Sequence, residues 1–290
     1  MTGRQTPTVT RDDIARGLRG LGLEPGDGVL VHASLSSFGH VSGGADAVVD
    51  AILDCIGDAG TAVFPTFTGD AVCGAILGVS GHQGAVIFPE AADVDLDDLR
   101  NIKEHHIFTG AIARAAWRRA DFLKGTHPFY SICARGPLAR ELVDFTDRYI
   151  FYSAEDKFIH RLGQLGGKTL LLGCSHISNS SIHVVAEIAG LEYKVQDRPY
   201  WKVTVDEYLA MPRERQAELL RAHCAMNLPY DIEKRYGRIE PELIRENAIR
   251  IGRIGAAEVR LMGIADFVRI GLAAVRKNPW LLADKVPKVD

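Results

Sequence analysis

The 290-residue chain lacks the features that would place it in a membrane or outside the cell. No apolar stretch approaches the roughly 18 residues that a membrane span needs. Its first seven residues carry no apolar signal-peptide core. The five cysteines are an odd number and contain no C-x-x-C pair, so free thiols in a reducing compartment are expected. We therefore predict a cytoplasmic protein with no membrane partner.

The chain also lacks a large excess of positive or negative charge. The formal net charge is −3, and the basic residues are scattered, without a run of five or six. This pattern gives no sign of nucleic-acid binding. The chain is long enough to bury an ample core, and it shows no internal repeat, low-complexity tract or linker. We therefore expect one domain over residues 1–290.

Apolar periodicity predicts alternating strands and helices. Helices are expected at residues 10–21, 45–56, 110–120, 157–165, 180–189, 213–226 and 264–275. Strands are expected at 29–32, 62–66, 132–134, 169–172 and 202–205, with a hairpin over 249–262 around Gly255. Short strand–helix connections predict an α/β fold with a mostly parallel central sheet and helices on both faces. Residues 67–107 lack clean periodicity and are expected to form a long irregular insertion, typical of a lid or binding loop.

The segment from Gly173 to Glu187 is the richest in reactive groups. It follows the predicted strand 169–172 and leads through small polar residues into a helix, the place where α/β proteins hold ligands. His183 and Glu187 are four residues apart and share one helix face. A carboxylate beside a histidine raises the pKa of the imidazole and orients the ring, as a general base requires. The alternative is a capped helix start with a surface His–Glu pair.

A second loop of small residues joins the strand 29–32 to the helix 45–56. It contains Ser34, Leu35, Ser36, Ser37, Gly39, Val41, Gly43 and Gly44. Small side chains let a ligand approach the main chain, and the amides of a helix start point outward. The loop has neither the G-x-x-x-x-G-K-[ST] nor the G-x-G-x-x-G pattern, which argues against a nucleoside triphosphate or NAD. A tight turn without a ligand is the other interpretation. His32, at the strand end, either faces this site or lies in the core.

Five segments, in this order and spacing, resemble the aminoglycoside 3-N-acetyltransferase family. They are 29–49, 60–67, 109–113, 127–137 with its His-Pro and Gly-Pro pairs, and 170–187. The resemblance implies an α/β/α sandwich that moves an acetyl group from acetyl-CoA to the amine of a small molecule such as an aminoglycoside or amino sugar. It implies that the Ser34–Gly44 loop lines the pantetheine arm of acetyl-CoA.

The resemblance also implies roles for the residues of this chain that match the family's motifs. His183 is the expected general base of a direct transfer, with Glu187, His176 and His127 as further catalytic candidates. Cofactor contacts are expected from His32, Thr66 and the residues of the Ser34–Gly44 loop named above. Substrate contacts are expected from Asp70, Tyr130 and Asn179. His176, Asn179 or backbone N–H groups are candidates to hold the thioester oxygen as its charge develops. No metal cofactor is expected.

The chain departs from the family pattern on the acceptor side. Tyr130 stands where the family often has a second histidine, and the region after Thr66 lacks the usual acidic and aromatic residues. Four carboxylates at Asp93, Asp95, Asp97 and Asp98 form either an attractor for a polycationic amine or a solvated acidic turn. These departures predict weak turnover of typical aminoglycosides.

Other interpretations remain open. His32, His176, His183 and Glu187 together could hold the metal ion of a hydrolase, although no H-x-x-x-H or H-E-x-x-H spacing occurs. A non-catalytic binding protein of the same fold is a further alternative. His127 is either an active-site group or a loop histidine without a chemical task. Cys174 is more typical of a small core residue than of a nucleophile. The apolar stretch 279–282 packs either on its own core or on a second copy, so a homodimer is possible.

Overall fold

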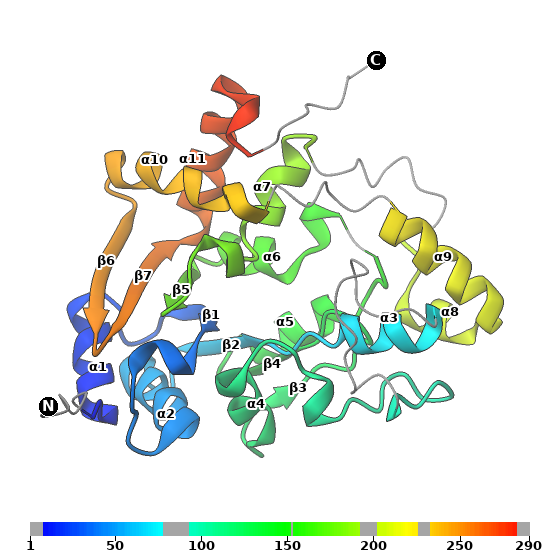
Figure 1. Cartoon of the computed structure of the whole chain (residues 1–290), viewed down its shortest axis with the longest axis horizontal. Helices are drawn as coiled ribbons and strands as arrows, with labels where there is room; N and C mark the ends of the chain where they lie inside the picture. The colour runs from blue at the N-terminus through cyan, green and yellow to red at the C-terminus, as the bar shows by residue number, and fades with distance from the viewer. Residues whose placement is uncertain (1–7, 78–92, 152, 192–201, 226–232, 283–290) are drawn as a thin grey trace, which may run out of the picture.

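The computed structural model describes residues 8–77, 93–151, 153–191, 202–225 and 233–282. Its centre is a seven-stranded sheet in the order β3-β4-β2-β1-β5-β7-β6 (Figure 1). The strands are β1 (Gly28–Ala33), β2 (Thr61–Pro65), β3 (Leu123–Lys124), β4 (Ile132–Arg135), β5 (Lys168–Leu172), β6 (Ile249–Ile254) and β7 (Ala257–Gly263). The α/β class is therefore confirmed.

The sheet is mixed, so the expectation of a mostly parallel sheet is wrong. β1 pairs in parallel with β2 and β5, whereas the pairs β2–β4, β3–β4, β5–β7 and β6–β7 are antiparallel. Short connections explain two of the antiparallel pairs, β3–β4 and β6–β7, because a parallel pair needs a crossover of a dozen or more residues. β6 and β7 are joined by a tight turn at Gly255, whose φ of 58° favours glycine. Only a short loop joins β3 to β4.

Helices cover both faces of the sheet, as predicted. One face packs against α1 (Arg11–Gly20), α2 (Gly44–Ile56) and α4 (Ala111–Arg118), and the other against α5 (Ala139–Thr146), α6 (Phe158–Gln164), α7 (Ile182–Ile188), α10 (Glu240–Arg245) and α11 (Ile264–Lys277). Side chains of β1 alternate between the faces: Val29 and Val31 join the first core and Leu30 the second. All three are almost fully buried.

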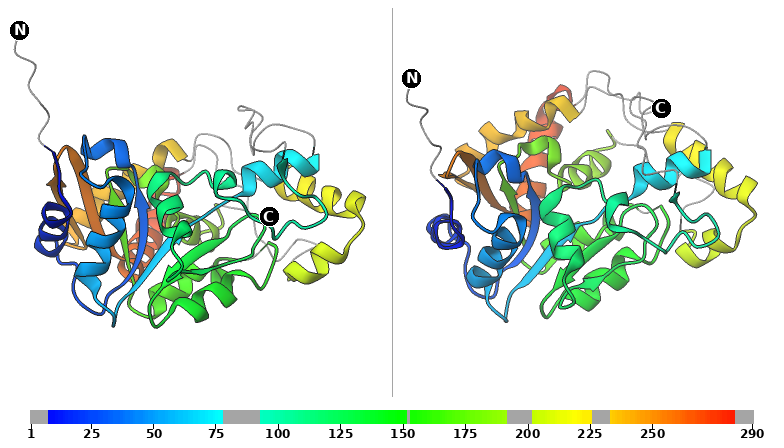
Figure 2. Two further views of the ribbon diagram at one scale, coloured as in Figure 1. Left: turned by 90° about the horizontal axis from the view of Figure 1, so that it is seen from below. Right: turned by 60° about the horizontal axis from the view of Figure 1, so that its bottom comes forward.

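A smaller helical group lies beyond one end of the sheet. It consists of α3 (Gly69–Leu77), α8 (Val205–Ala210) and α9 (Arg213–Ala225), which stand side by side in both Figure 1 and Figure 2. Val72 and Cys73 pack there with Tyr208, Leu219 and Leu220 in a cluster separate from the cores of the sheet. No helix in the described parts of the chain is long and apolar enough to cross a membrane.

Two local predictions fail in this helical group. Part of the segment 67–107, expected to be irregular, forms α3, while 78–92 lie outside the described residues. The alternating segment 202–205, expected as a strand, forms only an isolated antiparallel bridge between Thr204 and Tyr149, and α8 already begins at Val205. There Thr204 accepts a hydrogen bond from the Glu207 amide at 3.1 Å, and the Glu207 carboxylate accepts one from the Thr204 amide at 2.8 Å. This capping box satisfies two amides that a helix start leaves open, and Lys202 has a φ of 64°, unsuited to a strand.

The sequence pattern also missed two short helices. They are α5, with eight residues, and α10, with six. Elsewhere the predicted boundaries agree with the structure to within a few residues. Thr10 caps α1, since its hydroxyl accepts from the Asp13 amide at 3.2 Å.

Candidate active site

Three parallel strands end at one edge of the sheet. In the β1–β5 pair, Ala33 is level with Leu172, and the offset of the β1–β2 pair puts Pro65 level with His32. The loops that follow these strands begin at Ser34, Thr66 and Gly173 and therefore meet at the same edge. In α/β folds, ligands bind outside the carboxyl ends of the strands. The site lies where the loops from two neighbouring strands run to opposite sides of the sheet.

The loops after β1 and β5 are joined directly. The Ser34 amide donates to Leu172 O at 2.9 Å, and Ser37 Oγ lies 2.6 Å from Gly173 O and 2.9 Å from Ser34 Oγ. Gly173 has a φ of 67°, and a Cβ there would come 2.4 Å from the Ser37 Cβ. Only glycine therefore allows this close approach.

The rest of the predicted cofactor loop has an open main chain. After the 3-10 turn η1 (Leu35–Phe38), Gly39, Gly43 and Gly44 have φ values of 83°, 81° and 61° and lead into α2. Gly39 and Gly43 are exposed, so ligand atoms have access to this backbone. Val41 differs, because its side chain is buried in the core. It offers a ligand only its main chain.

His32 and His183 are neighbours at the edge. His32 is 9% exposed, and its Nε2 accepts the Ser180 amide at 3.4 Å. Burial, and secondly the charge of His183, lower the pKa of His32 to about 3, so His32 is neutral near pH 7. His183 lies in the first turn of α7 and is half-buried. The ring of Tyr236, from η7 (Glu233–Ile239), stands edge-on to it with centroids 5.8 Å apart.

Glu187 has a partner that the sequence did not predict. Its side chain is 7% exposed and forms an ion pair with Lys157, whose side chain is 14% exposed. The expected helix-face pairing with His183 therefore competes with a lysine 30 positions earlier in the chain. Neither the spacing nor the composition around Lys157 signals this contact. Removing one charge of such a mostly buried pair is strongly destabilising, because the other is left uncompensated.

His176 and Asn179 are part of the scaffold beneath the loop. His176 is 1% exposed. Its Nδ1 accepts a hydrogen bond from the side-chain Nδ2 of Asn179 at 3.2 Å, and its Nε2 lies 3.2 Å from Glu240 Oε2. Burial lowers the pKa of His176 to about 4 despite that carboxylate. Asn179 Oδ1 accepts the Ser181 amide at 3.0 Å. Both side chains are thus engaged within the protein, which favours positioning roles over contact with the thioester oxygen.

His127 is completely buried, and both ring nitrogens are used. Nδ1 accepts the amides of Phe129 and Tyr130 at 3.0 Å each, and Nε2 lies 3.0 Å from Tyr149 O. Burial lowers the pKa of His127 to about 4. This environment favours the second of the two interpretations, a loop histidine that shapes the chain.

The predicted acceptor-side residues lie between the strand ends and the helical group. Tyr130 Oη is 3.1 Å from Nε2 of His223 on α9, and its ring meets Phe67 edge-on at 5.9 Å. Asp70 lies in the first turn of α3 and is half-buried. Thr66 is fully buried, and its hydroxyl has no hydrogen-bond partner in the described part of the chain. A buried hydroxyl without a hydrogen-bond partner is uncommon in folded proteins.

Three further alternatives become less favourable. Cys174 Sγ donates to His32 O at 3.3 Å, and burial raises the pKa of the thiol to about 11, so the nucleophilic thiolate is disfavoured. Asp95 accepts the amides of Asp97 and Asp98, as expected of a solvated acidic turn. Among the described residues, the group close enough to share a metal ion contains none of the four ligands of the hydrolase alternative.

The three buried histidines make stability depend on pH. Each of His32, His127 and His176 has a folded pKa below the unfolded value of about 6.5, so the unfolded chain binds more protons and stability falls as pH drops below 6.5. Between pH 7 and 5.5 we expect a loss of about 1 kcal/mol for each, measured by urea unfolding. The variant H160A, which removes a half-exposed histidine, should show the same slope. Equal stability at both pH values would contradict these assignments.

Comparison with known proteins identifies the family. The profile described as aminoglycoside 3-N-acetyltransferase matches residues 30–276. The aminoglycoside N(3)-acetyltransferase VIII of Streptomyces fradiae is 29% identical over 281 residues, which cover 91% of each chain. The type IX enzyme of Micromonospora chalcea is 26% identical over 256 residues, 86% of this chain and 87% of the relative.

Solved structures share the fold. The apoenzyme of the acetyltransferase AAC(3)-IVa superposes with a TM-score of 0.65 at 20% identity and covers 98% of this chain and 94% of its own. AAC-IIIb in its binary complex with CoASH gives 0.63 at 20% identity, with 97% and 100% covered. Because the family profile spans most of the chain and all three strand ends, the protein belongs to the aminoglycoside 3-N-acetyltransferase family.

Proposed function

We propose that the protein transfers the acetyl group of acetyl-CoA to an amine of a small molecule, with His183 as the general base. The observation that carries the proposal is the position of His183, at the start of α7 beside the edge where three parallel strands end. Related proteins have been solved with CoASH and with a gentamicin, one ligand for each side of such a transfer.

The loops after β1 and β2 are suited to the amide-rich pantetheine arm. Ser34, Ser36 and Ser37 offer hydroxyls, and the glycines before α2 leave the main chain accessible. The buried Thr66 hydroxyl adds a polar group at the neighbouring strand end. Since His176 and Asn179 are engaged elsewhere, backbone N–H groups of these loops are the candidates to hold the thioester oxygen.

The chemical step needs a base because a nitrogen that attacks the thioester must lose a proton. In the proposed sequence, His183 accepts this proton as the amine nitrogen bonds to the carbonyl carbon. The tetrahedral intermediate then expels the CoA sulfur, and the departing thiolate takes the proton from the imidazolium. The neutral state of His32 helps, because no second positive charge opposes protonation of His183.

Glu187 has two separable roles in this scheme. Its carboxylate, one helical turn beyond His183, can stabilise the imidazolium, and it also neutralises the mostly buried Lys157. An amide at position 187 would remove both effects. The double variant E187Q/K157M removes both charges together and so separates the electrostatic effect on His183 from the structural pair.

The first test is the kcat of H183A. We expect a fall of roughly a hundredfold or more with nearly unchanged CoA affinity, because the base is lost while the CoA loop on other strand ends is intact. E187Q should lower kcat less than H183A does, but it should lower the free energy of unfolding more. The double variant E187Q/K157M should regain the free energy of unfolding but not the kcat. H160A is the control for both measurements. Near-wild-type turnover by H183A would reject His183 as the base.

The acceptor side generates a second prediction. Tyr130 is engaged with His223, and the carboxylates of Asp93 and Asp95 are occupied by partners within the same segment. The region after Thr66 also lacks the acidic and aromatic residues usual in the family, so fewer groups are available there to bind a polycationic amine. We expect kcat/KM for gentamicin-like aminoglycosides to stay below about 10⁴ M⁻¹s⁻¹, the lower end of ordinary enzymes, in an assay of thiol release from acetyl-CoA. Efficient turnover at or above that value would contradict this expectation.

A further inference from the structure

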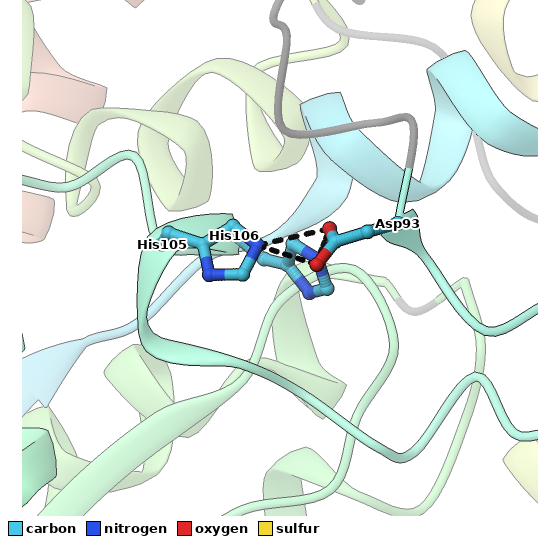
Figure 3. Close-up of side chains that lie close together, drawn as sticks. All are labelled: Asp93, His105 and His106. Atoms are coloured by element: carbon cyan, nitrogen blue, oxygen red, sulfur yellow. Dashed lines mark hydrogen bonds and ion pairs between the residues drawn. The ribbon is translucent and has the colours of Figure 1, made fainter.

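Three potential metal ligands that do not belong to the site described above converge on one another (Figure 3). His105 Nε2 lies 2.9 Å from each oxygen of Asp93, and His106 Nε2 lies 2.8 Å from Oδ1 of the same carboxylate. All three ligand atoms fall within 4.8 Å of one another. Both imidazoles present Nε2 to a single point.

We propose that Asp93, His105 and His106 bind a first-row divalent transition-metal ion, with zinc as the natural probe. Two imidazoles and a carboxylate are ligands that zinc accepts, with water as the fourth ligand; Mg²⁺ and Ca²⁺ prefer sites made of oxygen atoms. Metal–ligand bonds of about 2.1 Å in a tetrahedron place ligand atoms about 3.4 Å apart. The present separations of 2.8 and 2.9 Å need to widen by only about half an ångström.

The site combines a fixed ligand with an open side. The His106 side chain is 2% exposed, which fixes its ring, whereas those of His105 and Asp93 are each 46% exposed. Both histidines belong to the 3-10 turn η3 (Glu104–His106), and their rings meet edge-on with centroids 4.5 Å apart. An ion and its water can therefore enter from solvent without opening the core.

The ammonium group of Lys103 competes with a metal ion for the carboxylate of Asp93. Its Nζ lies 2.9 Å from Asp93 Oδ2, and its backbone amide donates to His106 Nδ1 at 3.3 Å. Metal on Nε2 puts the remaining imidazole proton on Nδ1, so metal binding breaks this long hydrogen bond. The ammonium also repels a cation. Removing the charge of Lys103 should consequently raise the affinity for metal.

The ion would act on structure and not on the acetyl transfer itself. It would tie Asp93 to the turn that leads into Thr109 and Gly110. Thr109 Oγ1 donates to Pro65 O at 2.6 Å, and a Cβ on Gly110 would lie 3.6 Å from Ala33 O. The segment held by the metal thus borders the ends of β1 and β2. A bound ion is expected to stabilise the folded state.

The test is calorimetric titration of chelator-treated full-length protein with zinc chloride, followed by the visible spectrum with cobalt. We expect one ion per chain, a four-coordinate cobalt spectrum, at least tenfold weaker binding in H105A and D93N, and several-fold tighter binding in K103M. The control H160A should match the wild type. H105A is the informative variant because its exposed side chain can be removed without disturbing the fold.

Three results would overturn the proposal: no zinc binding, binding that H105A and D93N leave unchanged, or a cobalt spectrum typical of six-coordinate surface sites. Circular dichroism of each variant checks that it is folded. None of these measurements depends on acetyl transfer, so the outcome is independent of the role of His183.

Discussion

The parallel pairing of β1 with both β2 and β5 is the constraint on which the proposed active site depends. Its register brings three chain segments, at Ser34, Thr66 and Gly173, to one edge of the sheet. The contact of Ser37 Oγ with Gly173 O then locks two of these loops together. The neighbouring antiparallel strands support the same edge, since Gly173 N donates to Glu258 O of β7 at 2.8 Å and Thr66 N to Ser131 O, just before β4, at 2.9 Å. The trio positions the loops, and the helices bury both of its faces.

Three buried histidines fix the chain segments around His183, the histidine that we assign to proton transfer. His32, His127 and His176 are almost inaccessible, and burial keeps each neutral while its ring nitrogens contact amides, a carbonyl or a carboxylate. His183 differs because it is half-buried and lies at a helix start. A neutral imidazole can fix a loop at little electrostatic cost, since it introduces no buried charge.

Local patterns predicted much of this arrangement from the sequence. Residues 29–32 and 169–172 were recognisable as buried strands and 45–56 as a helix, and strand ends indicated where a site would lie. Contacts between distant positions were not predictable, because the ion pair of Lys157 with Glu187 and the hydrogen bond of Tyr130 with His223 leave no periodic signal. The strand expected at 202–205 is reduced to a single bridge for a different reason: a capping box at Thr204 starts a helix at Val205.

The most direct test is the free energy of unfolding with and without CoA. If the strand-end loops form an acetyl-CoA site, CoA binds the folded chain alone and stabilises it by about 2.7 kcal/mol at a hundred times its dissociation constant. The melting temperature should therefore rise with CoA concentration. No change in melting temperature at millimolar CoA would contradict a CoA site at this edge of the sheet.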